Sequence, residues 1–285
     1  MKRFAMSAGL ILGGSLGACK PPAEAPAELG ELSIFLFENF DSEDEQVLQD
    51  ASLNLEEYLL TLDMDAKADD RAVTLPLLPT ERMGTVSATE GADPALQIPV
   101  GVSARSRHDF DTNLSLLKET NYVCIDSDTS KFSERTLLTD VDCIVDGTCA
   151  TLETSQWVRK ENPLAKIWFE IFRNYRTLEL EDGRTVMFAR TVLPKSFVSD
   201  GGGSSWDQNY AIEAWIPESD GDGTLRFYGL WSSVDISLIS DKGWAVLVQG
   251  GIDQSYEFAD NFLDPEVALE DYCNEDRDPD LTPPE

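Results

Sequence analysis

Residues 177–193 read TLELEDGRTVMFARTVL, and this stretch is the part of the sequence that decides the fold class. Asp182 and Gly183 stand between two runs rich in Thr, Val, Leu and Phe. An Asp-Gly pair in that position is a strong short-range signal for a β-hairpin, because both residues tolerate the left-handed backbone of the tight turn. We therefore expect antiparallel strands over residues 177–181 and 185–193.

The chain that follows this hairpin continues in the same pattern. Residues 210–216 alternate Tyr, Ile and Ala with other side chains until Pro217 ends the run. Residues 225–236 and 244–248 form further apolar runs, joined by a Ser-Asp-Lys-Gly turn at residues 240–243. Consecutive short strands linked by Gly and Asp turns favour an antiparallel meander.

The segment before the hairpin, residues 164–175, fits both a helix and a strand. Its apolar side chains follow a 3.6-residue period behind Asn162 and Pro163, which is a typical helix start. Aromatic and β-branched residues also alternate along it, as they do in strands. We favour the strand, because it pairs directly with the hairpin. Both faces of that strand are partly apolar, so something must cover each side of the sheet.

Shorter strands are expected nearer the amino terminus. Residues 32–37 form a short apolar run that we interpret as a buried strand. Residues 63–101 are rich in proline, and so long a loop is uncommon in a compact domain. We therefore place short strands at residues 73–78 and 98–104 within it.

Three segments are expected to be helical. Residues 50–62 and 109–119 have apolar side chains at helical spacing. Ser106 or His108 is the expected cap of the second helix. Residues 253–263 form a short closing helix.

These elements together predict an α+β, β-rich domain over residues 31–263, an antiparallel meander with one or two short helices packed on it. A sandwich, a half-barrel and a helix-grip-like sheet are all compatible with the pattern. Over residues 98–263, the order strand, helix, several antiparallel strands and terminal helix resembles the helix-grip fold of START-like domains. The resemblance rests on element order, and it implies a curved sheet that wraps a helix around an apolar cavity.

The amino terminus has the pattern of an export signal. Lys2 and Arg3 precede an apolar run at residues 4–16, which is shorter than the roughly 20 residues that a membrane-spanning helix needs. The run ends at Leu16, and two residues with small side chains, Gly17 and Ala18, then precede Cys19.

This four-residue motif resembles the lipobox of bacterial lipoproteins. The resemblance implies that residues 1–18 are removed, that Cys19 is acylated, and that the membrane is a partner through this lipid anchor. Residues 19–30, rich in Pro and Ala, are then the expected tether. Lys20 stands where an inner-membrane retention signal would have Asp, so the resemblance implies the outer membrane. It does not decide between the periplasmic and the cell-surface side of that membrane. The alternative is an ordinary secretory signal with a coincidental cysteine.

The chain has 285 residues, 53 Asp and Glu against 22 Lys and Arg, and a formal net charge of −31. Such a chain is poorly equipped to build a phosphate-neutralising surface, so we expect no nucleic-acid partner. The acidity is uneven: residues 21–66 hold thirteen acidic residues and no basic one, and residues 264–285 hold nine acidic residues and one Arg. We expect the tail to be disordered beyond Cys273.

Residues 159–195 differ, with eight basic residues against five acidic ones. One interpretation is a docking surface for an acidic segment, including one of the protein's own. The other, which we favour, is that these charges are the solvated faces of strands whose remaining residues build the core.

Four cysteines remain after Cys19, an even number in an exported chain, which implies two disulfides with three possible connectivities. A three-residue hairpin loop with Gly147 in the left-handed position would set Cys143 opposite Cys149. The other bridge, Cys124 to Cys273, would then close a long loop, with an expected effect of roughly 4 to 5 kcal/mol.

Catalytic and metal sites have weak support. His108 is the only histidine, and no nucleophile elbow surrounds a serine. Paired carboxylates with Trp206, Trp215 and Trp231 could serve a glycosidase, but with 53 acidic residues any pair is expected by chance. The loop that starts at Glu218 matches an EF-hand at its early positions and fails at the twelfth, where Gly replaces Glu.

We predict a membrane-anchored lipoprotein whose domain acts by binding or by presenting a surface, without catalysis, metal or cofactor. The first alternative is a carrier of an apolar small molecule or lipid in a START-like cavity. The second is a carbohydrate-active enzyme that uses paired carboxylates. The sequence leaves the protein or small-molecule partner open.

Overall fold

The computed structural model describes residues 24–64, 66, 71–127, 129–162, 165–219, 221–236, 240–269, 273 and 281–284. The predicted signal peptide, Cys19 and the first part of the tether lie outside these residues, and so does the tail beyond Cys273 apart from residues 281–284.

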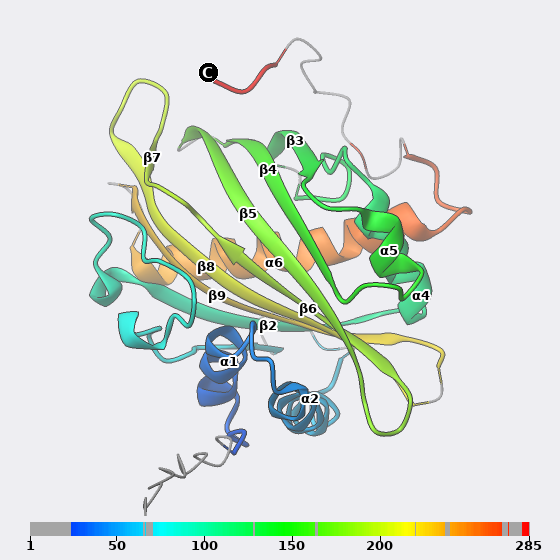
Figure 1. Ribbon diagram of the computed structural model, residues 1–285. Coiled ribbons are helices and arrows are strands. Elements are labelled where there is room, and N and C mark those ends of the chain that lie inside the picture. Colours follow the sequence, from blue (N-terminus) through cyan, green and yellow to red (C-terminus); the bar gives the residue numbers. More distant parts are fainter. Residues whose placement is uncertain are drawn as a thin grey trace, which may run out of the picture.

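One antiparallel sheet of nine strands organises the chain (Figure 1). The strands are β1 (Ala72–Val73), β2 (Ile98–Ser106), β3 (Ser130–Leu137), β4 (Thr151–Glu161), β5 (Lys166–Glu179), β6 (Thr185–Val192), β7 (Phe197–Val198), β8 (Ser204–Pro217) and β9 (Thr224–Ile236). Their order is β1-β2-β9-β8-β6-β5-β4-β3, with β7 paired to β8. The β-rich, antiparallel fold class is confirmed. A sandwich needs two sheets, whereas the described strands form one open sheet.

The hairpin predicted at Asp182 and Gly183 joins β5 to β6. Gly183 has a φ of +85°, and the Leu180 amide donates to the Arg184 carbonyl oxygen at 2.8 Å. The ambiguous segment before it is a strand, as favoured. The strands expected at residues 98–104, 210–216 and 225–236 also form, whereas the run at residues 73–78 contributes only Val73 to the two-residue strand β1.

The prediction of a strand at residues 32–37 is wrong. These residues lie in α1 (Leu29–Glu38), which packs beside α2 (Glu45–Leu59) on one face of the sheet. The carboxylate of Glu28 caps α1 by accepting from the Glu31 amide at 2.9 Å. A helix that is apolar on all sides is buried on all sides, and a short, mostly apolar run has no period that separates it from a strand.

The last part of the segment expected to form the tether contacts α2 or belongs to α1. The Asn54 amide on α2 donates to the carbonyl oxygens of Ala25 and Pro26, at 3.0 and 3.1 Å, and α1 begins at Leu29. The helix expected at residues 50–62 exists but starts and ends earlier, as α2.

The remaining helices are α4 (Phe110–Leu114), η3 (Ser115–Lys118), α5 (Val141–Val145) and α6 (Asp241–Leu263), with short 3-10 turns η1 (Thr80–Arg82) and η2 (Pro94–Leu96). The helix predicted at residues 109–119 is α4 continued by η3. Its cap is Asp109, whose carboxylate accepts from the Thr112 amide at 2.7 Å, and not Ser106 or His108.

The strand expected at residues 244–248 is a second wrong prediction. The chain from Ser240 onward forms the 23-residue helix α6, which absorbs the short helix predicted at residues 253–263. The Ser240 hydroxyl caps α6 by accepting from the Gly243 amide at 3.2 Å. In Figure 1, α6 lies across the face of the sheet opposite α1 and α2, which is the helix-grip-like arrangement among the expected alternatives.

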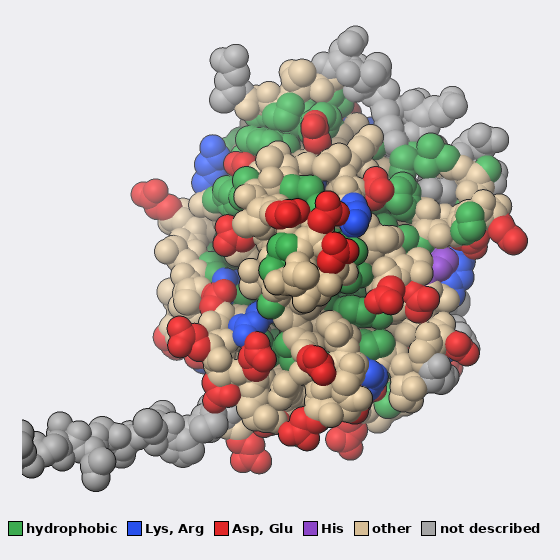
Figure 2. All heavy atoms as spheres, turned by 45° about the vertical axis from the view of Figure 1, so that its right-hand side comes forward, with side chains coloured by type: hydrophobic (Ala, Val, Ile, Leu, Met, Phe, Trp, Pro, Cys, Tyr) green, Lys and Arg blue, Asp and Glu red, His purple; other side chains and the backbone are tan. Residues whose placement is uncertain are grey.

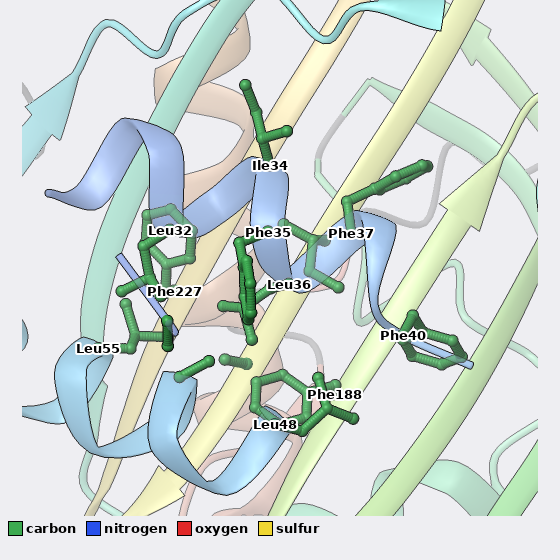
Figure 3. Close-up of a cluster of buried hydrophobic side chains, with 14 of the residues drawn as sticks. Leu32, Ile34, Phe35, Leu36, Phe37, Phe40, Leu48, Leu55, Phe188 and Phe227 are labelled. Carbon is green, nitrogen blue, oxygen red and sulfur yellow. The ribbon is translucent and has the colours of Figure 1, made fainter. Parts of the chain in front are cut away.

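The main hydrophobic core lies between the sheet and the two amino-terminal helices (Figure 3). Leu32, Leu36 and Phe37 of α1 are fully buried there, together with Leu48 of α2 and Phe227 of β9. Burying five such side chains stabilises the fold by on the order of 10 kcal/mol. We call this side of the sheet the α1–α2 face and the opposite side the α6 face.

Arginines of the basic segment hold the acidic α1–α2 region onto the sheet. Arg184 binds the Glu56 carboxylate with two hydrogen bonds, of 2.6 and 2.8 Å. Arg190 pairs with Asp41 at 2.7 Å, and Arg176 donates to two carbonyl oxygens of the α1–α2 loop. The favoured interpretation of solvated strand faces is therefore wrong for these residues, and docking of the protein's own acidic segment is correct.

Two adjacent glycines in α6 generate a stability prediction. A Cβ at Gly250 or Gly251 meets no atom within 4 Å, and neither residue has a positive φ. The double variant Gly250→Ala/Gly251→Ala should therefore be more stable by about 1 to 2 kcal/mol, since Gly is a poor helix former. Urea unfolding measures the free energy of unfolding of the variant and the parent, and we expect the same m value for both.

The matched control is Gly84→Ala. Gly84 has a φ of +62°, and a Cβ there would clash with the Glu38 carbonyl oxygen, so this variant should lose stability. A double variant less stable than the parent would contradict the prediction for α6.

Candidate functional site

A cavity of about 600 Å³ lies between α6 and the α6 face of the sheet. Most of its wall is apolar. The sheet contributes Val158, Phe169, Ile171, Met187, Trp206, Trp215 and Leu230, and the helix contributes Trp244, Val248, Ile252 and Ala259.

The helix α6 forms the roof of this cavity with one side. Trp244, Val248 and Ile252 follow each other at intervals of four residues, and Tyr256 continues the row, so they share a face of the helix. Ala259 is nevertheless the one buried residue among the described residues of α6. The helix therefore contacts the sheet mainly at β2, and a hollow remains between it and the strands that line the cavity.

A buried ion pair lies on the floor of the cavity. Arg173 of β5 approaches Glu213 of β8, with Nη2 to Oε1 at 3.1 Å, and its Nε donates to Thr191 at 2.9 Å. Glu213 is 4% exposed. Burial raises the pKa of Glu213 above its usual value, against the attraction of Arg173, Arg135 and Arg226.

A second cluster joins the floor to the roof. Arg226 of β9 pairs with Asp260 of α6, with Nη2 to Oδ1 at 3.0 Å, and also donates to Asn113. Its guanidinium carbon lies 5.3 Å from the ring centre of Tyr256. The Nε of Arg226 and the hydroxyl of Tyr256 are buried without a hydrogen-bond partner, and both residues line the cavity. Burial raises the pKa of Tyr256, so its hydroxyl stays neutral.

A third guanidinium stands beside this cluster. Arg135 of β3 is 2% exposed, donates to the Tyr175 hydroxyl at 2.6 Å, and lies 3.7 Å from the ring centre of Tyr122. Two of its nitrogens have no hydrogen-bond partner. Among the described residues, no carboxylate forms an ion pair with Arg135, so its positive charge is buried without a counter-ion.

Two carboxylates line the cavity, and both are already paired. Glu213 pairs with Arg173, and Asp126 accepts from Lys160 at 3.1 Å. Burial acts against ionisation of Asp126, but the charge and hydrogen bond of Lys160 outweigh it and hold the pKa of Asp126 below its usual value.

The carboxyl-terminal half of α6 is tied to the rest of the fold. Asp253 pairs with Arg71 at 2.7 Å, and Asp264 just beyond the helix pairs with Arg107 at 3.0 Å. The amino-terminal half is held differently: the Trp244 indole donates to Ser232 at 3.2 Å, and the other contacts are apolar.

The cysteines pair as the sequence analysis favours. Cys124 is bonded to Cys273, and Cys143 to Cys149, with Cα atoms 5.1 and 5.2 Å apart. The local structure that brings Cys143 and Cys149 together is not the expected hairpin, because Cys143 lies in α5. Gly147 does have a positive φ, of +68°, and it turns the chain at the end of that helix so that Cys149 returns to Cys143.

The other residues singled out from the sequence lie in different parts of the structure. His108 is half-buried, with Nε2 2.9 Å from the Asp260 carbonyl oxygen. Trp206 and Trp215 line the cavity, whereas Trp231 lies in the core on the α1–α2 face, 5.8 Å from the Phe37 ring. Within the described residues, no group of three or more His, Cys, Asp or Glu is placed to hold a metal ion, and no helix is long and apolar enough to cross a membrane.

Sequence reasoning missed the charged floor of the cavity. Glu213 interrupts the apolar run from Ala211 to Ile216, and Arg173 falls between Ile171 and Tyr175 on the same face of β5. A charge inside an apolar strand face was the available signal. The interpretation of the charges in residues 159–195 as solvated strand faces does not use this signal.

The raised pKa of Glu213 predicts a pH dependence of stability. The ionised form is disfavoured in the fold, so the free energy of unfolding of the wild type, measured against Glu213→Gln, should fall as the pH rises above 4.5. The slope should be at most about 1.4 kcal/mol per pH unit. Urea unfolding between acidic and neutral pH measures it, with Glu134→Gln at an exposed position of β3 as the control. A difference that grows with pH would contradict the assignment.

No protein-family model matches the chain, and no curated protein matches it. Among solved structures, the chain is similar to the STAR-related lipid transfer protein from Xanthomonas axonopodis, with 15% identity, 58% of this chain and 85% of that chain covered, and a TM-score of 0.39. The human StarD13 (DLC2) lipid transfer and protein localization domain has 12% identity, coverage of 59% and 77%, and a TM-score of 0.35. The Zhui aromatase/cyclase from Streptomyces sp. R1128 has 7% identity, coverage of 61% and 92%, and a TM-score of 0.36. Two of these are named for lipid transfer and one for an enzyme, and fold similarity does not by itself assign an activity.

Proposed function

We propose that this protein is a membrane-anchored lipoprotein whose domain carries an apolar small molecule beneath α6. The observation that supports the proposal is the cavity, which α6 covers while most of its side chains stay only partly buried. Its volume of about 600 Å³ falls within the range of small-molecule sites.

The composition of the wall favours an apolar ligand. Three tryptophans and a set of aliphatic side chains surround a few polar groups, which is the usual composition of ligand pockets. A ligand that buries about 300 Å² of apolar surface gains roughly 7 kcal/mol from leaving water. A hollow of this kind is costly to keep empty, since its lining loses packing contacts.

From the sequence, a domain that acts by binding or by surface presentation is the first prediction, and the carrier is its first alternative. The cavity favours the carrier, because surface presentation does not require a hollow under α6. It does not favour a glycosidase, since Glu213 and Asp126 are both engaged with cations and a general acid and base must be available to the substrate.

A lipid anchor on Cys19 completes the proposal. It would hold the domain next to a membrane that both stores and receives apolar molecules. The support for this part is the sequence motif of Leu16, Gly17, Ala18 and Cys19.

Binding of the neutral fluorescent probe N-phenyl-1-naphthylamine tests the carrier. The full chain should bind the probe with a blue-shifted emission, and Ile171→Trp, which fills the cavity, should weaken binding by roughly tenfold. Leu138→Trp is the matched control, because Leu138 is exposed and outside the cavity. Equal loss in both variants, or no binding by the parent, would overturn the proposal.

Radiolabelled palmitate tests the anchor. A bacterial host should attach the label to the full chain, and Cys19→Ala should abolish it, because the thiol is the lipid acceptor. Cys143→Ala is the control for removal of a cysteine and should keep the label. An unlabelled wild type would refute the anchor while leaving the cavity proposal standing.

A further inference from the structure

The polar floor of the cavity points to the chemistry of the ligand. We infer, on the basis of the proposed carrier function, that the ligand is a monocarboxylic acid with a long apolar body, whose carboxylate binds Arg226 and Tyr256.

The first step of the argument is a pair of unused donors. Arg226 Nε and the Tyr256 hydroxyl have no hydrogen-bond partner, although each is shielded from water. A buried donor without a partner is costly, and native structures rarely keep one. The guanidinium carbon of Arg226 lies 5.3 Å from the centre of the Tyr256 ring, so both residues belong to the same part of the cavity lining.

The second step is the charge balance. Three arginines gather at this end of the cavity, Arg135, Arg173 and Arg226, and all three act on Glu213 electrostatically. Among the described residues they face two paired carboxylates, Glu213 and Asp260. The cluster therefore carries a surplus of one positive charge in a place with little water, and a single ligand anion would neutralise it.

The third step is the fit of the group. A carboxylate has two oxygens that accept hydrogen bonds, and it forms its strongest ones with guanidinium and hydroxyl donors. The donors of Arg226 and Tyr256 can bind the two oxygens of one carboxylate, and its single negative charge balances the one surplus positive charge of the arginines. An ammonium head group would add to the surplus, and an alcohol would leave it uncompensated.

The acidic exterior does not oppose this ligand once it is inside. Charges on the outer surface are screened over about 8 Å at physiological salt, whereas Arg135 and Arg226 are buried and act at short range. The net charge of −31 therefore bears on how fast an anion approaches more than on how tightly it is held.

A series of ligands with one C16 chain tests the inference on the purified full chain. Hexadecanoic acid, hexadecanol and hexadecyltrimethylammonium compete with bound N-phenyl-1-naphthylamine. The acid should displace the probe at a concentration roughly tenfold or more below that of the alcohol, with the cation weakest.

Two variants tie the preference to the proposed groups. Tyr256→Phe should reduce the advantage of the acid over the alcohol several-fold, because it removes one of the two proposed donors. Tyr122→Phe is the matched control, because Tyr122 also lines the cavity but its hydroxyl already donates to the Leu116 carbonyl oxygen at 2.7 Å. Arg135→Gln, at a residue outside the lining, removes the surplus charge and should also reduce the advantage.

The outcomes separate the two proposals. Probe binding with no preference for the acid, or equal effects of Tyr256→Phe and Tyr122→Phe, overturns the assignment of a carboxylate and leaves the carrier intact. Absence of probe binding overturns both.

Discussion

Packing of α1 and α2 against one face of the sheet supports the rest of the structure. Leu32, Leu36 and Phe37 enter the core without exposure, and they meet large side chains such as Phe188 and Phe227 (Figure 3). Because this face supplies a dense core, the opposite face does not need one. The long helix α6 can then lie over a hollow, fixed by ion pairs and a disulfide near its carboxyl end, and the hollow is the feature on which the proposed function depends.

Charge has different consequences outside and inside the domain. Acidic side chains are spread widely over the surface in view in Figure 2, with fewer basic ones between them. Several arginines pair or lie buried within the fold: Arg184 and Arg190 hold the acidic α1–α2 region, Arg226 lines the cavity, and Arg135 is buried. A large negative total thus coexists with a positive interior cluster, since net charge governs solubility and approach, whereas local pairing governs binding.

The parts predicted correctly from sequence are those that local chemistry decides. Asp182 and Gly183 define a hairpin by turn geometry, and the even cysteine count with the short spacing of Cys143 and Cys149 favoured the observed disulfides. The errors fall on short apolar runs, at residues 32–37 and 244–248. Such a run has no diagnostic period, and its conformation follows from the surfaces that cover it. The site was missed for a related reason. Charged side chains on a strand are typical of solvent-facing positions, and only the covering helix makes the face of Arg173 and Glu213 an interior.

The sequence by itself determined the antiparallel meander, the hairpin between β5 and β6, and the uneven placement of charge along the chain. These depend on turn residues, alternation and composition, which act over a few neighbouring positions. The tertiary structure alone decided that the amino-terminal run is a helix, that the basic segment holds the acidic one, and that α6 encloses a cavity with three arginines at one end. Each of these results from contacts between segments far apart in the chain, and the free energy of such contacts outweighs the small local preferences that a sequence displays.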